Sequence, residues 1–318
     1  MKCFITGGAG FIGSNVADRL LFDGHEVRVY DNLTTGNRRF LSTAEKNKNF
    51  SFVQGDLLDK DLLKSSMEGM DIVFHFAANA DIRHGLEHPY KDLEQNTLAT
   101  FNVLEAMRSL EIKRIVFSST GAVYGEAEVI PTPENAPFPI QTSLYGASKV
   151  ACEGMIASYA EGYGFMAHIF RFVSILGDRY THGHVFDFCK KLRKDPSTLP
   201  VLGDGTQKKS YLCIDDCVNA ILCALDKVDD KINIFNLGVD NYCQVSDSAK
   251  WVSDEMGLEP EIVYSGGRQG WVGDNPFTYL ATEKIRSLGW KSQYSIEESV
   301  RKTVRWLMDN EWVFDVRE

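Results

Sequence analysis

Short apolar runs alternate with stretches of helical apolar spacing along the first 172 residues. Six runs bounded by polar residues or glycine predict strands at 2–6, 26–30, 50–53, 71–76, 113–117 and 166–170. Helices are predicted between them, among others at 15–22, 89–110 and 143–161. Strands that alternate with helices indicate an α/β fold with a doubly wound parallel sheet of the Rossmann type.

The alternation breaks beyond Arg171. Helices are predicted at 185–193, 215–225, 245–256, 283–288 and 296–308, and a strand at 232–237 is expected to return to the main sheet. We therefore expect a Rossmann domain built from residues 1–172 and about 211–240. A smaller C-terminal α/β lobe is expected from residues 173–210 and 241–318.

A glycine-rich turn joins the first strand to the first helix. Gly7, Gly10 and Gly13 follow the spacing Gly-x-x-Gly-x-x-Gly, with Phe11 and Ile12 between them. In this context Gly7 permits a tight turn, Gly10 lets a pyrophosphate approach the backbone, and Gly13 lets the helix pack close to the sheet. The N–H groups at the helix start then bind the phosphates, so the turn predicts a dinucleotide site.

Asp31 ends the second strand, 18 residues after Gly13. A carboxylate there can accept hydrogen bonds from the adenosine ribose and would repel a 2′-phosphate, which favours NAD over NADP. Asp31 could instead be a turn residue before Asn32. Arg38 and Arg39 could attract a 2′-phosphate and weaken the preference for NAD.

Polar and small residues end the third and fourth strands. Asp56, followed by Leu57, is expected either to meet the adenine or to cap the helix that starts near Asp59. After the fourth strand, Phe76, Ala77 and Ala78 would let a cofactor lie against the backbone. Asn96 on the next helix is either exposed or joins the strand ends by hydrogen bonds.

A hydroxyl-rich strand end and a Tyr-x-x-x-Lys pair carry the candidate chemistry. Ser118, Ser119 and Thr120 end the fifth strand, at the sheet edge where open α/β sheets bind ligands. Tyr145 and Lys149 lie one helical turn apart and leave the same helix face. An ammonium beside a phenol should lower the pKa of Tyr145 and make it a usable acid or base. The alternative is an ordinary solvated pair.

These residues, with Leu288-Gly289-Trp290, resemble the extended short-chain dehydrogenases/reductases, and most of all the nucleotide-sugar 4-epimerases of the UDP-glucose/UDP-galactose type. The resemblance implies that Tyr145 is the acid/base, that Lys149 bonds the nicotinamide ribose, and that Thr120 bonds the sugar O4. It implies epimerisation at C4 through a transient 4-keto sugar, in which the hydride is transferred to NAD and then transferred back. The expected NAD-binding set is Gly7, Gly10, Phe11, Ile12, Gly13, Asp31, Asn32, Asp56, Leu57, Phe76, Ala77, Ala78, Asn96, Ser118, Tyr145, Lys149 and Phe172.

The substrate implied by the resemblance is a nucleotide-diphosphate sugar, with a UDP-hexose favoured. Besides Thr120 and Tyr145, the residues expected to contact it are Ser174, Lys209, Arg268 and Thr278. Ser174 stands where the family usually has asparagine, and Lys209 where it has arginine. The segment 179–184 contains two histidines and departs from the family pattern. We expect it to be a substrate-contacting or structural loop rather than a metal site.

Three other functions compete with epimerisation. The related 4,6-dehydratases carry two acids where this chain has Gly121 and Ala122, so elimination of water is disfavoured. A net NAD(P)-dependent oxidoreductase of nucleotide sugars stays open. A dinucleotide-binding sensor without catalysis would need the glycine turn and Asp31 but not Thr120, Tyr145 and Lys149.

Composition excludes some partners and suggests a compartment. The net charge of −10 disfavours nucleic acid, and no run of 18 apolar residues predicts a membrane span. The start of the chain does not resemble a signal peptide, and the seven scattered cysteines contain no Cys-x-x-Cys pair, so we expect a cytoplasmic protein with buried free thiols. By the resemblance, helices 89–110 and 143–161 should form a homodimer interface.

Overall fold

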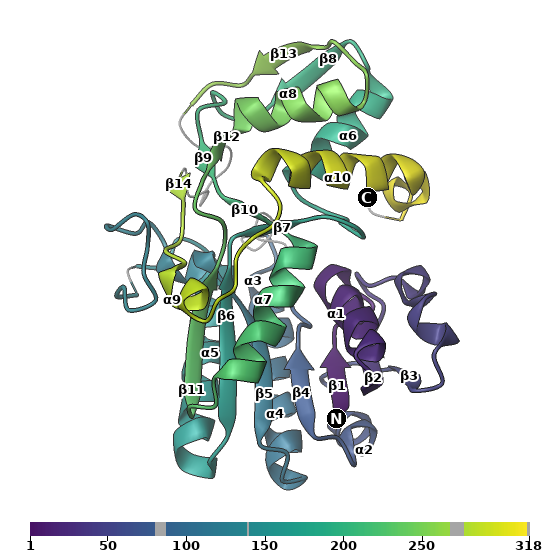
Figure 1. Cartoon of the computed structure of the whole chain (residues 1–318), viewed down its shortest axis with the longest axis vertical. Helices are drawn as coiled ribbons and strands as arrows, with labels where there is room; N and C mark the ends of the chain where they lie inside the picture. Colours follow the sequence, from purple (N-terminus) through teal and green to yellow (C-terminus); the bar gives the residue numbers. More distant parts are fainter. Residues whose placement is uncertain (80–86, 139, 268–276, 317–318) are drawn as a thin grey trace. The chain divides into compact units, whose positions relative to one another are not determined.

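Seven strands form one sheet in the order β11-β6-β5-β4-β1-β2-β3 (Figure 1). The neighbours from β1 to β6 pair in parallel, and the order reverses between β1 and β4. The predicted Rossmann-type α/β fold is therefore confirmed, as is the return of strand 232–237 to the sheet. The strands are β1 (Lys2–Thr6), β2 (Glu26–Asp31), β3 (Phe50–Gln54), β4 (Ile72–His75), β5 (Arg114–Thr120), β6 (Met166–Phe172) and β11 (Ile232–Leu237).

This computed structural model describes residues 1–79, 87–138, 140–267 and 277–316. The chain divides into two compact units. The first unit comprises Met1–Glu126, Pro137–Phe172 and Ile221–Phe235, and the second comprises Ala127–Ala136, Val173–Ala220 and Asn236–Glu318. Helix α7 (Ile214–Lys227) contributes residues to both units.

Local capping interactions mark both ends of helix α5 in the first unit. The side chain of Ser143 caps α5 by accepting a hydrogen bond from the Gly146 N–H at 3.0 Å, and the helix ends at Gly164 in the left-handed region. The predicted helix 89–110 is interrupted by a π-helical turn, a form that often marks functional sites. The helices are α1 (Phe11–Phe22), α2 (Lys60–Met67), α3 (Pro89–Asp92), the π turn η3 (Leu93–Leu98), α4 (Ala99–Ser109) and α5 (Leu144–Tyr163), with 3₁₀ turns η1 (Arg38–Leu41), η2 (Ala44–Lys46) and η4 (Gly121–Tyr124).

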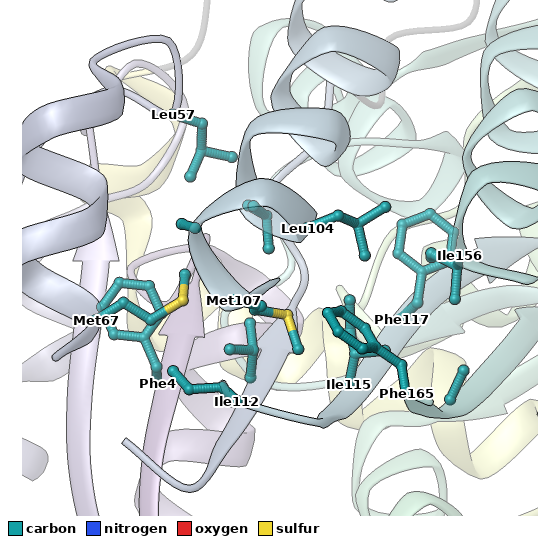
Figure 2. Close-up of a cluster of buried hydrophobic side chains, with 14 of the residues drawn as sticks. Phe4, Leu57, Met67, Leu104, Met107, Ile112, Ile115, Phe117, Ile156 and Phe165 are labelled. Atoms are coloured by element: carbon teal, nitrogen blue, oxygen red, sulfur yellow. The ribbon is translucent and has the colours of Figure 1, made fainter. Parts of the chain in front are cut away.

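The core of the first unit lies between the sheet and helices α2, α4 and α5 (Figure 2). Strand side chains such as Phe4 and Phe117 meet helix side chains such as Met67, Leu104 and Ile156. Each such side chain contributes roughly 1.5–3 kcal/mol when fully buried. Helix α1 packs against β1 and β2 and covers the opposite face of the sheet. This packing fixes the strand ends that carry the candidate site.

The described residues of the second unit form short strands and several helices. Strand β9 (Lys208–Lys209) lies between β12 (Cys243–Gln244) and β14 (Phe277–Thr278). Two further pairs are β7 (Ser174–Leu176) with β10 (Tyr211–Cys213), and β8 (Thr198–Val201) with β13 (Glu261–Tyr264). The helices are α6 (His184–Lys194), α8 (Val245–Glu255), α9 (Glu283–Ser287) and α10 (Ile296–Asp309), followed by the 3₁₀ turn η5 (Glu311–Phe314).

All seven cysteines are free thiols. Six are buried and Cys223 on α7 is partly exposed. Burial raises the pKa of Cys3 and of Cys213 to about 11 and that of Cys189 to about 12. Among the described residues, none of the helices has the length and apolar character needed to cross a membrane.

Candidate active site

The glycine turn brings three backbone segments into close contact. Gly7 has φ +67°, and a Cβ atom added there would lie 2.6 Å from the backbone nitrogen of Ala77. A Cβ on Gly13 would lie 2.3 Å from the carbonyl oxygen of Gly7. Helix α1 begins directly after Gly10. The turn therefore leaves its backbone and the N–H groups of a helix start open to a phosphate group, as a dinucleotide site requires.

Asp31 lies at the end of β2 and is only 7% exposed. Its carboxylate accepts hydrogen bonds from the N–H groups of Ala9 at 2.9 Å and Leu33 at 2.8 Å. Burial raises the pKa of Asp31, and these two hydrogen bonds oppose the rise. Arg38 forms an ion pair with Glu45 at 2.7 Å, so its positive charge already has a carboxylate partner. A carboxylate at this position, beside the glycine turn, fits NAD.

Asp56 organises the loop after β3. It accepts hydrogen bonds from the Leu58 N–H and from the side-chain amide of Asn32, both at 2.9 Å. Asp59, not Asp56, caps α2 by accepting from the Leu62 N–H at 3.1 Å. The capping alternative for Asp56 is therefore wrong, and its contact with adenine stays a prediction. The neighbouring side chain of Leu57 packs into the hydrophobic core.

A buried chain of hydrogen bonds supports the end of β4. The two ring nitrogens of His75 bond the hydroxyls of Thr6 at 2.7 Å and Thr100 at 2.9 Å. Burial lowers the pKa of His75 to about 3, so the ring is neutral at pH 7. The Thr6 hydroxyl also accepts from the Ala77 N–H at 3.3 Å. The backbone at Ala77, which faces Gly7, is thus held in place.

Asn96 joins the segment after β4 to α5 through its side chain. It is 1% exposed, so the exposed alternative is wrong. Its Oδ1 accepts from the Asn79 N–H at 2.8 Å, and its Nδ2 donates to the Ser148 hydroxyl at 2.9 Å. Asn96 lies in the π turn. Asn96 therefore forms linking hydrogen bonds, but they join the segment after β4 to a helix rather than one strand end to another.

Thr120, Tyr145 and Lys149 are gathered at the end of β5. Tyr145 and Lys149 lie in the first turns of α5, and the phenol of Tyr145 hydrogen-bonds the hydroxyl of Thr120. The Lys149 ammonium is 2% exposed and donates to the Ser118 carbonyl oxygen at 2.9 Å. Thr120 lies opposite Phe172 in the register of β5 and β6. The solvated-pair alternative is wrong.

The pKa of Tyr145 departs from its prediction. Burial raises the pKa of Tyr145 to about 12, and the hydrogen bond with Thr120 only partly opposes this. Burial also lowers the pKa of Lys149 to about 8. The predicted lowering of the Tyr145 pKa by Lys149 is wrong for the chain by itself. The reason is that removal of water from around the phenol disfavours the phenolate. The Lys149 ammonium donates to the Ser118 carbonyl oxygen.

The predicted substrate residues of the second unit lie on short strands. Lys209 and Thr278 are partners in the register of β9 and β14. Ser174 is exposed on β7 and lies opposite Tyr211 on β10. Arg268 lies outside the described residues. The structure thus places Lys209 and Thr278 side by side, and their contact with a substrate stays a prediction.

The segment 179–184 is packed rather than open. Tyr180 is buried and stacks on His182 with ring centroids 6.0 Å apart. His184 stacks on Tyr211 at 4.7 Å and bonds the Ser248 hydroxyl at 2.6 Å. Burial, with a smaller effect of the Lys209 charge, lowers the pKa of His184 to about 3. Within the described residues, no group of three or more His, Cys, Asp or Glu side chains could hold a metal ion.

Two buried networks behind the site were missed from the sequence. One is the His75 chain, and the other is an ion pair between Glu153 and Arg171. An ionisable residue inside an apolar strand is the available signal for His75 and Arg171. For Glu153 the signal is its position one helical turn after Lys149.

The family model of the NAD dependent epimerase/dehydratase family matches residues 3–238. This chain belongs to that family. A crystal structure of a UDP-galactose 4-epimerase is 38% identical, with a TM-score of 0.88 over 98% of this chain and 100% of that chain. The Thermus thermophilus UDP-glucose 4-epimerase, in complex with NAD, is 32% identical, with a TM-score of 0.86 over 97% and 99%. A dTDP-glucose 4,6-dehydratase of Streptomyces venezuelae, with NAD bound, is 27% identical, with a TM-score of 0.88 over 98% of each chain.

The resemblance to extended short-chain dehydrogenases/reductases is thereby confirmed, and the protein is an NAD-dependent enzyme of this family. The local geometry agrees, because the glycine turn has no room for side chains at Gly7 and Gly13 and Asp31 ends the adjoining strand.

Proposed function

We propose that this enzyme epimerises C4 of a nucleotide-diphosphate hexose, with a UDP-hexose favoured, through a transient 4-keto sugar. The observation that carries the proposal is the trio of Thr120, Tyr145 and Lys149, with Gly121 and Ala122 where a dehydratase needs acids. The similarity to UDP-galactose and UDP-glucose 4-epimerases supports it.

In this proposal Tyr145 moves one proton at the sugar O4. Thr120 bonds the phenol, and in the proposal its hydroxyl would bond the same sugar oxygen. NAD, when bound, would supply the acceptor and the donor for the hydride at C4. Tyr145 alone keeps its proton at neutral pH, so it is ready to act as the acid in the return step. A positive charge bound beside it lowers its pKa and prepares it to act as the base. Lys149 supplies a buried ammonium that would bond the cofactor ribose.

The two units divide the binding work in this proposal. The first unit binds NAD through the residues predicted from its strand ends. The second unit binds the nucleotide sugar through Ser174, Lys209 and Thr278, together with Arg268. Lys209 contributes a positive charge to the diphosphate without the two-pronged geometry of an arginine.

A panel of UDP-, GDP-, CDP- and dTDP-hexoses tests the reaction, with NMR of the anomeric region as the readout. The expected result is conversion of one UDP-hexose into its C4 epimer without added NADH. A 4-keto-6-deoxy product would instead identify a dehydratase. Consumption of NADH in proportion to product would identify a net oxidoreductase. A Tyr145→Phe variant that keeps the function of the protein would instead identify a sensor.

We further propose a homodimer formed through the helices α3–α4 and α5. Leu93, Phe101 and Leu144 are large apolar residues of these segments that stay 37–47% exposed. Burial of such residues is what a helix–helix interface supplies. Sedimentation is expected to give a dimer at micromolar concentration, and a monomer there would contradict the proposal.

The free thiols of all seven cysteines suit a reducing compartment such as the cytoplasm.

A further inference from the structure

A fully buried ion pair lies directly behind the candidate catalytic residues. The side chains of Arg171 and Glu153 are 3% and 6% exposed. Arg171 donates from Nη2 to Oε2 of Glu153 at 2.7 Å and from Nε to Oε1 at 3.0 Å. This is the two-pronged geometry of strong arginine–carboxylate pairs.

The ion pair holds several segments of the first unit together. The Ser119 hydroxyl on β5 donates to Glu153 on α5. Arg171 on β6 donates from Nη1 to the Tyr124 hydroxyl at 2.6 Å, and Tyr124 ends the turn η4. The guanidinium also lies over the ring of Phe138 at 5.0 Å. Two strands, one helix, one turn and one loop therefore meet at a single pair of charges.

These segments are the ones that carry the candidate chemistry. Ser119 immediately precedes Thr120, and η4 begins at the next residue, with the Ala122 N–H donating to the Thr120 hydroxyl at 3.1 Å. Glu153 lies one helical turn after Lys149 and two turns after Tyr145. The hydroxyl of Thr120 and the phenol of Tyr145 come from different elements, and the ion pair ties those elements together one residue from Thr120.

Stability alone does not account for such a pair. Charges lose their hydration on burial, and replacing a buried ion pair by apolar side chains of similar size is often neutral or stabilising. Its expected benefit is a single arrangement of the groups around it. Small displacements matter at a reacting centre, because a shift of about 1 Å can lower the rate about 100-fold.

We propose that Glu153 and Arg171 are positioning residues that hold the Thr120 end of β5 against the turns of α5 carrying Tyr145 and Lys149. The effect on turnover rests on the proposed function. The effect on geometry does not, because it concerns only where Thr120 and Tyr145 lie relative to each other.

The test is the double variant Glu153→Leu with Arg171→Met, which removes both charges and leaves neither partner alone. We expect a melting temperature close to that of the wild type, a kcat lower by about 100-fold, and a KM for the sugar changed by less than about threefold. The matched control is Glu161→Leu with Lys231→Met. That pair also anchors α5, at 2.9 Å, but its side chains are 68% and 50% exposed, so kcat should not change.

Crystal structures of the wild type and the double variant separate the two proposals. Loss of the Thr120–Tyr145 hydrogen bond in the variant supports the positioning role whatever reaction the enzyme catalyses. A variant that keeps this hydrogen bond, or an active wild type whose variant keeps its kcat, overturns it. A wild type that epimerises no sugar overturns the proposed function alone.

If the double variant does not fold, Ser119→Ala answers the question. It removes one link from the ion pair to β5 and leaves the two contacts of Arg171 with Glu153 intact. We expect about a tenfold lower kcat at unchanged KM and unchanged melting temperature. An unchanged kcat would contradict the proposal.

Discussion

Gly13→Ala should damage the cofactor turn through a contact that can be measured in advance. The added Cβ would lie 2.3 Å from the Gly7 carbonyl oxygen and 2.7 Å from the Cα of Gly8. Both are backbone atoms, so α1 must move by about 1 Å to restore an ordinary contact near 3.4 Å. Overpacking of this kind costs about 1–3 kcal/mol, and the better helix propensity of alanine recovers at most about 1 kcal/mol.

We therefore expect the free energy of unfolding to fall by about 1–2 kcal/mol in urea denaturation. NAD affinity should fall at least about tenfold, which corresponds to about 1.4 kcal/mol, because the shifted helix start no longer meets the phosphates. Titration of cofactor-free protein with NAD, followed by protein fluorescence, measures this.

Gly154→Ala, in helix α5 of the same unit, is the matched control. A Cβ there has no neighbour within 4 Å, so this helical substitution should stabilise the protein slightly and leave NAD affinity unchanged. A Gly13→Ala protein with wild-type stability and wild-type NAD affinity would refute the reasoning from backbone contact.

Three further predictions concern single residues. Tyr145→Phe should lose nearly all turnover yet bind NAD with wild-type affinity, as measured by NMR of the sugar and by titration; substantial residual turnover would contradict the assigned acid/base. Burial lowers the pKa of Lys149 from 10.5 to about 8. Between those pH values the unfolded chain still holds the lysine proton that the folded chain has released, so the free energy of unfolding rises with pH. Lys149→Met should therefore gain stability over the wild type below pH 8, and unfolding curves should show that gain shrinking by roughly 3 kcal/mol up to pH 10.5; a pH-independent gap would contradict the shift. Asp59→Ala removes the cap of α2 and should cost about 1 kcal/mol in urea unfolding, whereas Lys64→Ala on the same helix should cost less; equal effects would argue against the cap.

The strands of the main sheet could be predicted because each is a run of apolar residues long enough to stand out. Strand β1, for example, spans the predicted residues Lys2–Thr6. The second unit is harder, because strands such as β9 and β12 contain two residues each and have no period of their own. The π turn at 93–98 also has no local signature, and the contacts that Asn96 makes from it reach Asn79 and Ser148, which lie elsewhere in the sequence.

The members of the candidate site could be predicted better than their electrostatics. Tyr145, Lys149 and Thr120 meet as expected, because the carboxyl ends of parallel strands share one edge of the sheet. The direction of the Tyr145 pKa could not be predicted, because it depends first on how deeply the folded chain buries the phenol. Glu153 on α5 and Arg171 on β6 belong to different elements, and only the folded chain pairs them.

The burial of the cysteines has a practical use in spectroscopy. Thiolates react with maleimides, and the buried thiols of Cys3, Cys189 and Cys213, with pKa values of about 11 to 12, are almost entirely protonated at pH 7. Cys223 is partly exposed on α7, the helix that contributes to both units. A label attached at pH 7 should therefore go to Cys223 in the unmodified protein, giving a single probe on the helix that the two units share.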